Sequence, residues 1–408
     1  MQNFGQKKYS TIISWAVFLF TLAIVLISLV SAVFPALILR SLGGLQDYTG
    51  INPFEPGIWA YPFLAANFIV FGLTVLYFKN KLPQLITKSI RFIFNFEVSA
   101  SVATLVIIIL LGLYVVLSIN QLYSGMYDDD YYARIQSWLA NSNLVQFSSD
   151  QFGYQLMIIL EVVSMKVFAS YKAIPFISDV ALLVLTYLIT VEMTKKRFAG
   201  IVAMVIVLQS TLFLTYQTYV SYPNFWIVFY LLSLYLVYKT WPLSIIPYVA
   251  SIFTKILTAV FIPMTLFFIY RADMPRKKKI YAVIPYVILI LMGVAYLFAT
   301  HTGYTRGIID SHRFWDGFTA VYLSLRYDGL ILLFMIPLTV GLFIASRNGY
   351  LQADSILFLI MSMFISAPLI ESLSDAVNVP YRFVPLVVFF AMGVGVLLSK
   401  KKSLSNSD

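Results

Sequence analysis

Four long apolar runs constrain this chain more than any other feature of its sequence. A helix needs about 20 consecutive apolar residues to cross the roughly 30 Å hydrocarbon core of a bilayer. Charged residues make up only 11% of the chain, against about 25% in an average soluble protein. The chain is therefore predicted to be an all-α integral membrane protein. The runs, which approach or exceed the required length, cover residues 11–39, 98–119, 280–299 and 383–398.

The positive charges are concentrated in short segments between the apolar runs. Cytoplasmic loops of membrane proteins carry an excess of lysine and arginine. The formal net charge of +10 therefore indicates topology rather than a nucleic-acid partner. We expect these segments and both termini on the cytoplasmic side of a multi-pass protein, with the plasma membrane as its location. The basic segments are residues 7–8, 79–91, 195–197, 271–279 and 400–402.

Placing every basic segment on one side predicts a polytopic bundle of about twelve transmembrane helices in contact with the lipid bilayer. The first long outer segment, residues 120–171, is expected to hold extracytoplasmic juxtamembrane helices. Residues 151–168 are predicted to lie along the outer surface, with Glu161 and Lys166 as a surface pair, because a crossing there would place residues 195–197 outside. The expected spans are near residues 11–39, 58–78, 98–119, 174–193, 198–218, 224–238, 242–254, 256–270, 280–299, 328–346, 354–370 and 381–399.

The residue types present exclude several kinds of site. The chain has no cysteine, so it has neither a disulfide nor a thiolate nucleophile or metal ligand. Its two histidines are too few for a histidine-based metal site. The basic segments contain no Walker loop and no glycine fingerprint. Chemistry is therefore expected within the membrane or at its outer face.

Three adjacent carboxylates, Asp128, Asp129 and Asp130, follow the third predicted span. Such neighbours repel one another unless a cation or hydrogen-bond donors offset the charge. One of them could cap the following helix, but three together at a membrane surface favour a functional role. A carboxylate there could be the general base of an inverting glycosyl transfer. The three could also hold Mg²⁺ or Mn²⁺ against a phosphate, although no cofactor is certain.

Either role needs cations to offset the charge of a phosphate leaving group. Arg306 and Arg313 lie in a predicted outer loop, residues 300–327. Lys255 lies at the outer tip of a predicted hairpin, where it could also simply extend to the interface. Arg382 begins the last span from the outside, against the charge bias of the loops. We expect these four residues to bind the donor phosphate.

Several short motifs occur in an order and spacing that resemble the GT-C superfamily of membrane glycosyltransferases, which includes protein O-mannosyltransferases and aminoarabinose transferases. The resemblance covers residues from about 98 to about 399. The motifs are Asp128-Asp129 followed by Tyr132-Ala133-Arg134-Ile135, a surface helix from Tyr154 to Phe168, Lys196-Arg197-Phe198-Ala199, Thr254-Lys255 and Ile262-Pro263.

The chain is expected to have three parts, of which the resemblance implies the second, and the resemblance also implies a reaction. The parts are an N-terminal transmembrane hairpin with a basic cytoplasmic loop (1–97), a GT-C-like transmembrane glycosyltransferase module (98–399) and a basic cytoplasmic tail (400–408). The sugar would arrive on a polyprenyl phosphate, because nucleotide sugars are not available outside the cytoplasm, and pass to a glycan, lipid or protein acceptor. Asp128 matches the catalytic base or metal ligand of the family, and Asp129 matches its acidic neighbour.

The chain also departs from the family. Residues 221–224 read Ser-Tyr-Pro-Asn where many members carry an aspartate, which argues against a metal site of the oligosaccharyltransferase kind. Residues 151–153 replace the motif that precedes the surface helix, and residues 11–79 have no counterpart. Two alternatives to a transferase therefore stay open. The chain could be a catalytically silent subunit of a membrane complex, or a transporter of lipid or sugar.

Overall fold

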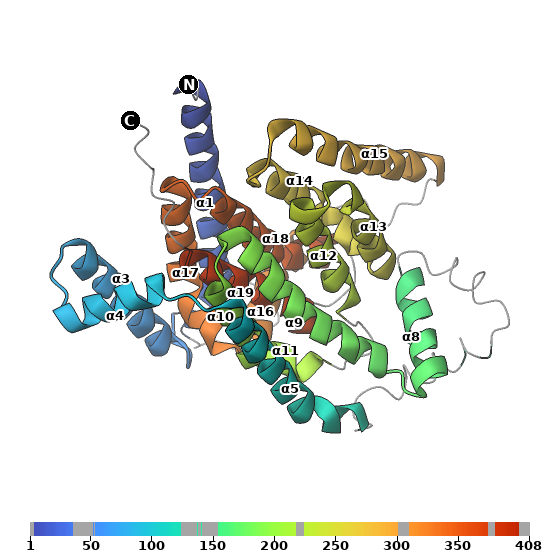
Figure 1. Cartoon of the computed structure of the whole chain (residues 1–408), viewed down its shortest axis with the longest axis horizontal. Coiled ribbons are helices and arrows are strands. Elements are labelled where there is room, and N and C mark those ends of the chain that lie inside the picture. Colours follow the sequence, from blue (N-terminus) through green and yellow to red (C-terminus); the bar gives the residue numbers. More distant parts are fainter. Residues whose placement is uncertain are drawn as a thin grey trace. The chain divides into compact units, whose positions relative to one another are not determined.

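The computed structural model describes residues 4–35, 52, 54–123, 137, 140, 154–217, 224–300, 310–373 and 380–399. Every regular element within these residues is a helix, as Figure 1 shows. The chain divides into two compact units, Met1–Glu97 with Val294–Asp408, and Val98–Gly293. The N-terminal hairpin therefore packs with the C-terminal helices.

The first unit contains one long N-terminal helix, a helical pair that follows it and the helices of the C-terminal part. They are α1 (Phe4–Val33), α3 (Ala60–Phe78), α4 (Gln84–Asn95), α16 (Ser311–Leu325), α17 (Gly329–Arg347), α18 (Gln352–Leu373), the short 3-10 helix η3 (Pro380–Phe383) and α19 (Val384–Leu397).

The second unit contains the middle of the chain. Its elements are α5 (Ala100–Tyr123), α8 (Gln155–Phe168), α9 (Ala173–Thr194), α10 (Arg197–Gln209), α11 (Thr211–Tyr216), α12 (Phe225–Lys239), η1 (Trp241–Leu243), α13 (Ile245–Thr254), η2 (Ile256–Phe261), α14 (Ile262–Arg271) and most of α15 (Arg276–Thr300).

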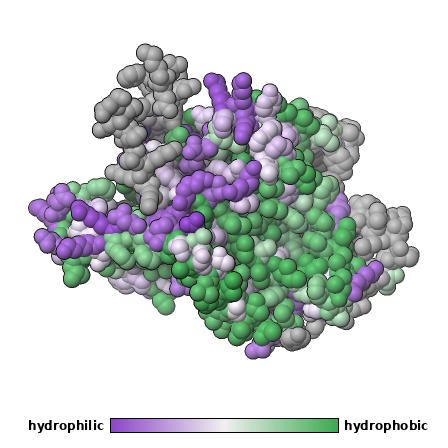
Figure 2. Space-filling view, viewed as in Figure 1, coloured by the Kyte–Doolittle hydropathy of each residue, from purple (hydrophilic) through white to green (hydrophobic). Residues whose placement is uncertain are grey.

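Eight helices in the described part of the chain are long and apolar enough to cross a bilayer, which makes this a multi-pass membrane protein. The face seen in Figure 2 carries the broad hydrophobic surface that such helices present to lipid. Four further apolar helices, at 197–209, 225–239, 241–254 and 256–271, are each shorter than the roughly 20 residues that a straight crossing needs. The eight long candidates are Thr11–Val33, Ala60–Phe78, Ala100–Leu122, Ala173–Thr194, Arg276–Ala295, Gly329–Arg347, Gln352–Ser372 and Pro380–Leu397.

Helix α1 is an integral part of the first unit, although the sequence resemblance gave it no counterpart. The ring of Phe18 stacks on that of Phe343 in α17, with centroids 4.1 Å apart. The Ser14 hydroxyl donates a hydrogen bond of 2.7 Å to the buried carboxylate of Asp354 in α18. A buried polar contact of this kind is costly to break and therefore fixes the register of α1 against α18.

Residues 311–325 form a helix, α16, where the sequence analysis expected an outer loop. The helix packs closely on α18 because Gly317 has no side chain. A Cβ atom added at Gly317 would lie 2.4 Å from the Cα atom of Pro368. Two helix backbones can approach this closely only through a small residue.

We expect Gly317→Ala to lower the free energy of unfolding by about 1–3 kcal/mol, because the added methyl group forces the two backbones apart. Gly72→Ala in α3 is the matched control, since no heavy atom lies within 4 Å of its added Cβ. That substitution should be neutral or stabilise the helix by up to about 1 kcal/mol. Thermal unfolding of both variants in detergent measures the difference, and equal melting temperatures would exclude the close packing.

Candidate functional site

The helices of the second unit run so that their charged and polar residues gather at two opposite ends. Helices α9 and α12 run in the same direction, because Asp179 contacts Asn224 near their starts and Glu192 contacts Lys239 near their ends. The guanidinium of Arg197 donates to the Val98 carbonyl at 3.5 Å, which places the start of α5 beside the ends of α9 and α12.

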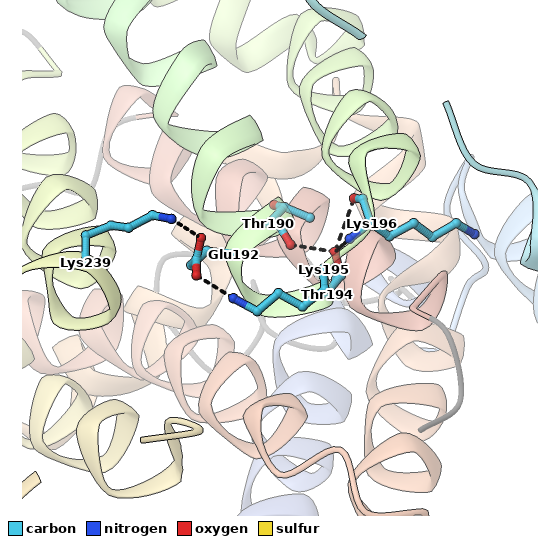
Figure 3. Close-up of polar contacts among 6 residues, drawn as sticks. All are labelled: Thr190, Glu192, Thr194, Lys195, Lys196 and Lys239. Atoms are coloured by element: carbon cyan, nitrogen blue, oxygen red, sulfur yellow. Dashed lines mark hydrogen bonds and ion pairs between the residues drawn. The ribbon is translucent and has the colours of Figure 1, made fainter. Parts of the chain in front are cut away.

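One end, the ionic end, consists of Glu192, Lys195, Lys196, Arg197 and Lys239. Glu192 forms ion pairs with Lys195 and, at 2.7 Å, with Lys239 (Figure 3). Lys195 adopts the left-handed conformation (φ 56°) that commonly ends a helix. The Thr194 hydroxyl accepts a hydrogen bond of 3.2 Å from the Lys196 amide, which closes the turn. Several of the cations used to predict topology thus lie together at one end of the unit.

The opposite end, the polar end, is the candidate site. Its members come from α5, α9, α12, the ends of neighbouring helices and the tip of the α13–α14 hairpin, and all except Gln121 are buried. The segment that carries Asp128 follows α5 directly in the sequence, from this same end. The members of the polar end are Gln121, Lys172, Asp179, Gln217, Asn224 and Lys255.

A chain of hydrogen bonds connects three members of the polar end. The Gln217 amide donates to the Gln121 side-chain oxygen at 2.7 Å, and accepts from the Ser118 hydroxyl at 2.8 Å. The Lys172 ammonium donates to the Gln121 carbonyl at 3.3 Å. These bonds join the end of α5 to the start of α9 and the end of α11. These hydrogen-bonded amides hold the helix ends in one arrangement.

Asp179 is a carboxylic residue within a membrane-spanning helix and is only 1% exposed. Its Oδ1 accepts a hydrogen bond of 2.8 Å from the Asn224 amide at the start of α12. Its Oδ2 is buried without a hydrogen-bond partner among the described residues. Carboxylates within membrane helices are expensive and usually functional, so Asp179 belongs to the candidate site.

Lys255 lies at the tip of a hairpin, as the sequence predicted. The Tyr248 hydroxyl donates to the Thr258 carbonyl at 2.8 Å. Ten residues of continuous helix would span about 15 Å, more than a tyrosine side chain can reach, so the chain folds back between these two residues. The backbone of Lys255 is extended (φ −160°, ψ 107°) between α13 and η2.

The side chain of Lys255 is 7% exposed, and its ammonium lies 5.3 Å from the ring centroid of Trp226 in α12. Trp226 follows Asn224 closely, so the cation lies at the level of the buried carboxyl group of Asp179. A cation over an aromatic face gains favourable electrostatic energy when it is removed from water. The polar end therefore combines a buried acid with a buried cation.

An apolar groove of about 390 Å³ lies between α8 and α13 in the same unit. Helix α8 packs one side on its neighbours, and Glu161 is completely buried there while Lys166 is exposed. The prediction of a surface pair between them was therefore wrong, because helix packing and not solvent surrounds Glu161. The groove, which could accept a hydrocarbon chain, is lined by Gln155, Leu156, Ile159, Ile246, Val249, Ala250 and Phe253.

The remaining predicted cations lie in the first unit or outside the described residues. Arg382 is in η3, and its Nε and Nη1 atoms are buried without a hydrogen-bond partner among the described residues. Arg313 lies at the start of α16 and pairs with Asp310 at 3.7 Å. Both residues belong to the first unit, whereas Lys255 belongs to the second.

The predicted acids lie outside the described residues. They are Asp128, Asp129 and Asp130, and Arg306 also lies outside the described residues. Among the residues that the structure does describe, no three acidic or histidine side chains come together as a metal site.

Sequence reasoning missed the pair of Asp179 and Asn224. The available signal was an aspartate inside the predicted span 174–193, which is costly in lipid unless it is paired or functional. Its partner could not be found in the same way, because the two residues are separated by two helices in the sequence.

Comparisons of the chain with protein-family models, with curated proteins and with solved structures found no match.

Proposed function

We propose that this protein is an inverting glycosyltransferase that moves a hexosyl or pentosyl group from a polyprenyl-phosphate donor to a glycan, lipid or protein acceptor. The acceptor hydroxyl attacks the anomeric carbon while Asp128 takes its proton as general base. The bond between that carbon and the phosphate oxygen breaks, and polyprenyl phosphate leaves. The resemblance to the GT-C superfamily, carried by the order of the short motifs, is the basis of this proposal.

The observation that supports it most is the buried Lys255 at the polar end of the second unit. A buried cation at a membrane boundary is costly, and a phosphate leaving group is the kind of charge it would neutralise. The Asp128 segment follows α5 from the same end. The apolar groove beside α13 offers room for part of a polyprenyl chain. In this proposal Arg382, Arg306 and Arg313 are further phosphate-binding candidates, and Asp128, Asp129 and Asp130 could hold a divalent metal.

In the proposed topology the chain crosses the plasma membrane about twelve times. Both termini lie in the cytoplasm. This topology requires the four shorter apolar helices to cross with the help of flanking residues or of a locally thinner bilayer, and α8 to lie on the outer surface. The gathering of cations at the ionic end supports this orientation.

A topology reporter fused after Arg197 should therefore be cytoplasmic, and one inserted near Asn143 should be external. The expectation follows from the basic segments, which resist translocation. Paired reporters that are active only on opposite sides of the membrane measure it. An external Arg197 would mean that α8 crosses the bilayer, and it would invert every later loop.

The transferase proposal is tested by an assay of the purified protein in nanodiscs. Polyprenyl-phosphate sugar is supplied with candidate acceptors, and release of polyprenyl phosphate is measured with and without EDTA. Acceptor-dependent release supports transfer, and its loss with EDTA supports the metal. Absence of release with every acceptor would favour a catalytically silent subunit.

A transporter is the second candidate, and Asp179 is the observation that favours it. Transporters place ionisable groups and interrupted helices around a substrate site within the membrane, and the second unit has both a buried aspartate and the broken segment α13–η2–α14. Flux of labelled lipid or sugar across liposomes, without release of polyprenyl phosphate, would establish transport instead of transfer.

A further inference from the structure

Helix α4 (Gln84–Asn95) separates its polar and apolar residues almost completely. At 100° per residue, its apolar side chains cover an arc of about 200°, and its polar side chains, except that of Ser89, cover the opposite side. The polar face carries two cations, and the segment from Lys79 to Phe96 contains no acidic residue. The apolar face consists of Leu85, Ile86, Ile90, Phe92, Ile93 and Phe94. The polar face consists of Gln84, Thr87, Lys88, Arg91 and Asn95.

Most of this apolar face is exposed. No residue of α4 is buried, and Leu85 and Phe92 are 76% and 65% exposed. Lys88 and Arg91 form no ion pair with the described residues. A wide, exposed apolar face and a cationic polar face are typical of helices that lie in a membrane interface.

The neighbouring helices hold α4 at the membrane surface. Helix α3 ends at Phe78, and Asn80, in the left-handed conformation (φ 54°), reverses the chain with the help of a bond from the Lys81 amide to the Leu76 carbonyl. The next span begins at Ala100. Because α4 lies between two helices of spanning length, both of its ends are bound to one face of the bilayer.

We propose that α4 lies in the cytoplasmic membrane interface and binds anionic lipid headgroups through Lys88 and Arg91, with Lys79 and Lys81 at its start. The apolar face enters the region of the acyl chains, and the cations remain at the depth of the phosphates. Anionic lipids attract such cations at the cytoplasmic leaflet. This inference rests on membrane residence and the proposed topology, and is independent of glycosyl transfer.

The depth of α4 in the membrane is tested with single introduced cysteines. Because the chain has no cysteine of its own, each introduced cysteine is the only site that the label can modify. Full-length Ile93→Cys and Gln84→Cys proteins are labelled with a fluorophore and placed in nanodiscs. We expect lipid-borne doxyl groups to quench the label at Ile93 severalfold more than the label at Gln84, and aqueous iodide to show the reverse order. Protection of both labels from both quenchers would mean that protein covers α4, and would overturn the proposal.

Lipid selectivity is tested in nanodiscs of phosphatidylcholine with phosphatidylglycerol. Energy transfer from the label at Ile93 to an acceptor-labelled phosphatidylglycerol measures enrichment of the anionic lipid around α4. Lys88→Gln with Arg91→Gln should reduce this enrichment, by up to about fivefold for each cation removed, while the doxyl quenching at Ile93 persists.

Lys277→Gln with Lys278→Gln is the matched control. It removes two cations from another predicted cytoplasmic segment, at the start of α15, and should leave the enrichment around α4 unchanged. An equal loss in both double variants would assign the preference to the whole basic face. No loss in either would show that α4 binds the bilayer without charge selection. Both outcomes contradict the proposal.

Discussion

Replacing Asp128 with asparagine is expected to lower the turnover of sugar transfer by about 10²–10⁴-fold, the usual contribution of general base catalysis. The substitution keeps the shape of the side chain and removes the charge that accepts a proton or holds a cation. Donor binding and folding should be preserved, because asparagine has nearly the same size and shape as aspartate. Release of polyprenyl phosphate in nanodiscs, measured at saturating donor, gives the turnover.

Asp130→Asn is the control for this experiment. The two residues are close in sequence and carry the same charge, but Asp130 is the better placed to cap the helix predicted to follow. Asparagine is about as good a helix cap as aspartate, so this variant should keep most of its activity. Equal and mild losses at both positions would indicate a solvated acidic patch and would remove the basis for Asp128 as the base.

The long spans could be predicted from sequence because lipid imposes one strong requirement on them. Residues 174–193 were predicted to cross, and α9 covers Ala173–Thr194. The predicted span 198–218 is interrupted at Ser210, whose hydroxyl accepts from the Phe213 amide at 3.2 Å and begins α11. Serine is tolerated in an apolar helix, so hydropathy alone did not reveal this break.

The contacts between distant helices could not be predicted. The pair of Asp179 and Asn224 depends on the parallel packing of α9 and α12, and the packing of α16 on α18 depends on Gly317. Neither follows from local periodicity. The amphipathic pattern of α4 was visible in the sequence, but the positive-inside rule accounted for its cations and the apolar face was overlooked. Of the predicted site, the structure describes Lys255, whereas Asp128 lies outside the described residues.

Lys255→Met should lower kcat/KM for the polyprenyl-phosphate donor by about 10²–10³-fold, the usual loss when a group that stabilises developing negative charge is removed. Methionine has a similar length and packs well against an aromatic ring, so it can occupy the buried position over Trp226 without the charge. Lys255→Arg keeps the charge and should retain more activity, although a larger planar group fits this site less well. Donor-dependence kinetics in nanodiscs measure both variants.

Lys196→Met separates the loss of a phosphate-binding charge from the general cost of changing a buried lysine. Lys196 is 1% exposed, and its ammonium lies 5.3 Å from the ring of Phe198, so its surroundings resemble those of Lys255. It lies at the ionic end, where the proposed reaction needs no cation. Donor kinetics close to wild type for Lys196→Met, beside a large loss for Lys255→Met, would connect the polar end to the phosphate. If the two variants lost activity equally, the effect would belong to folding, and the phosphate site would have to be sought at Arg306, Arg313 or Arg382.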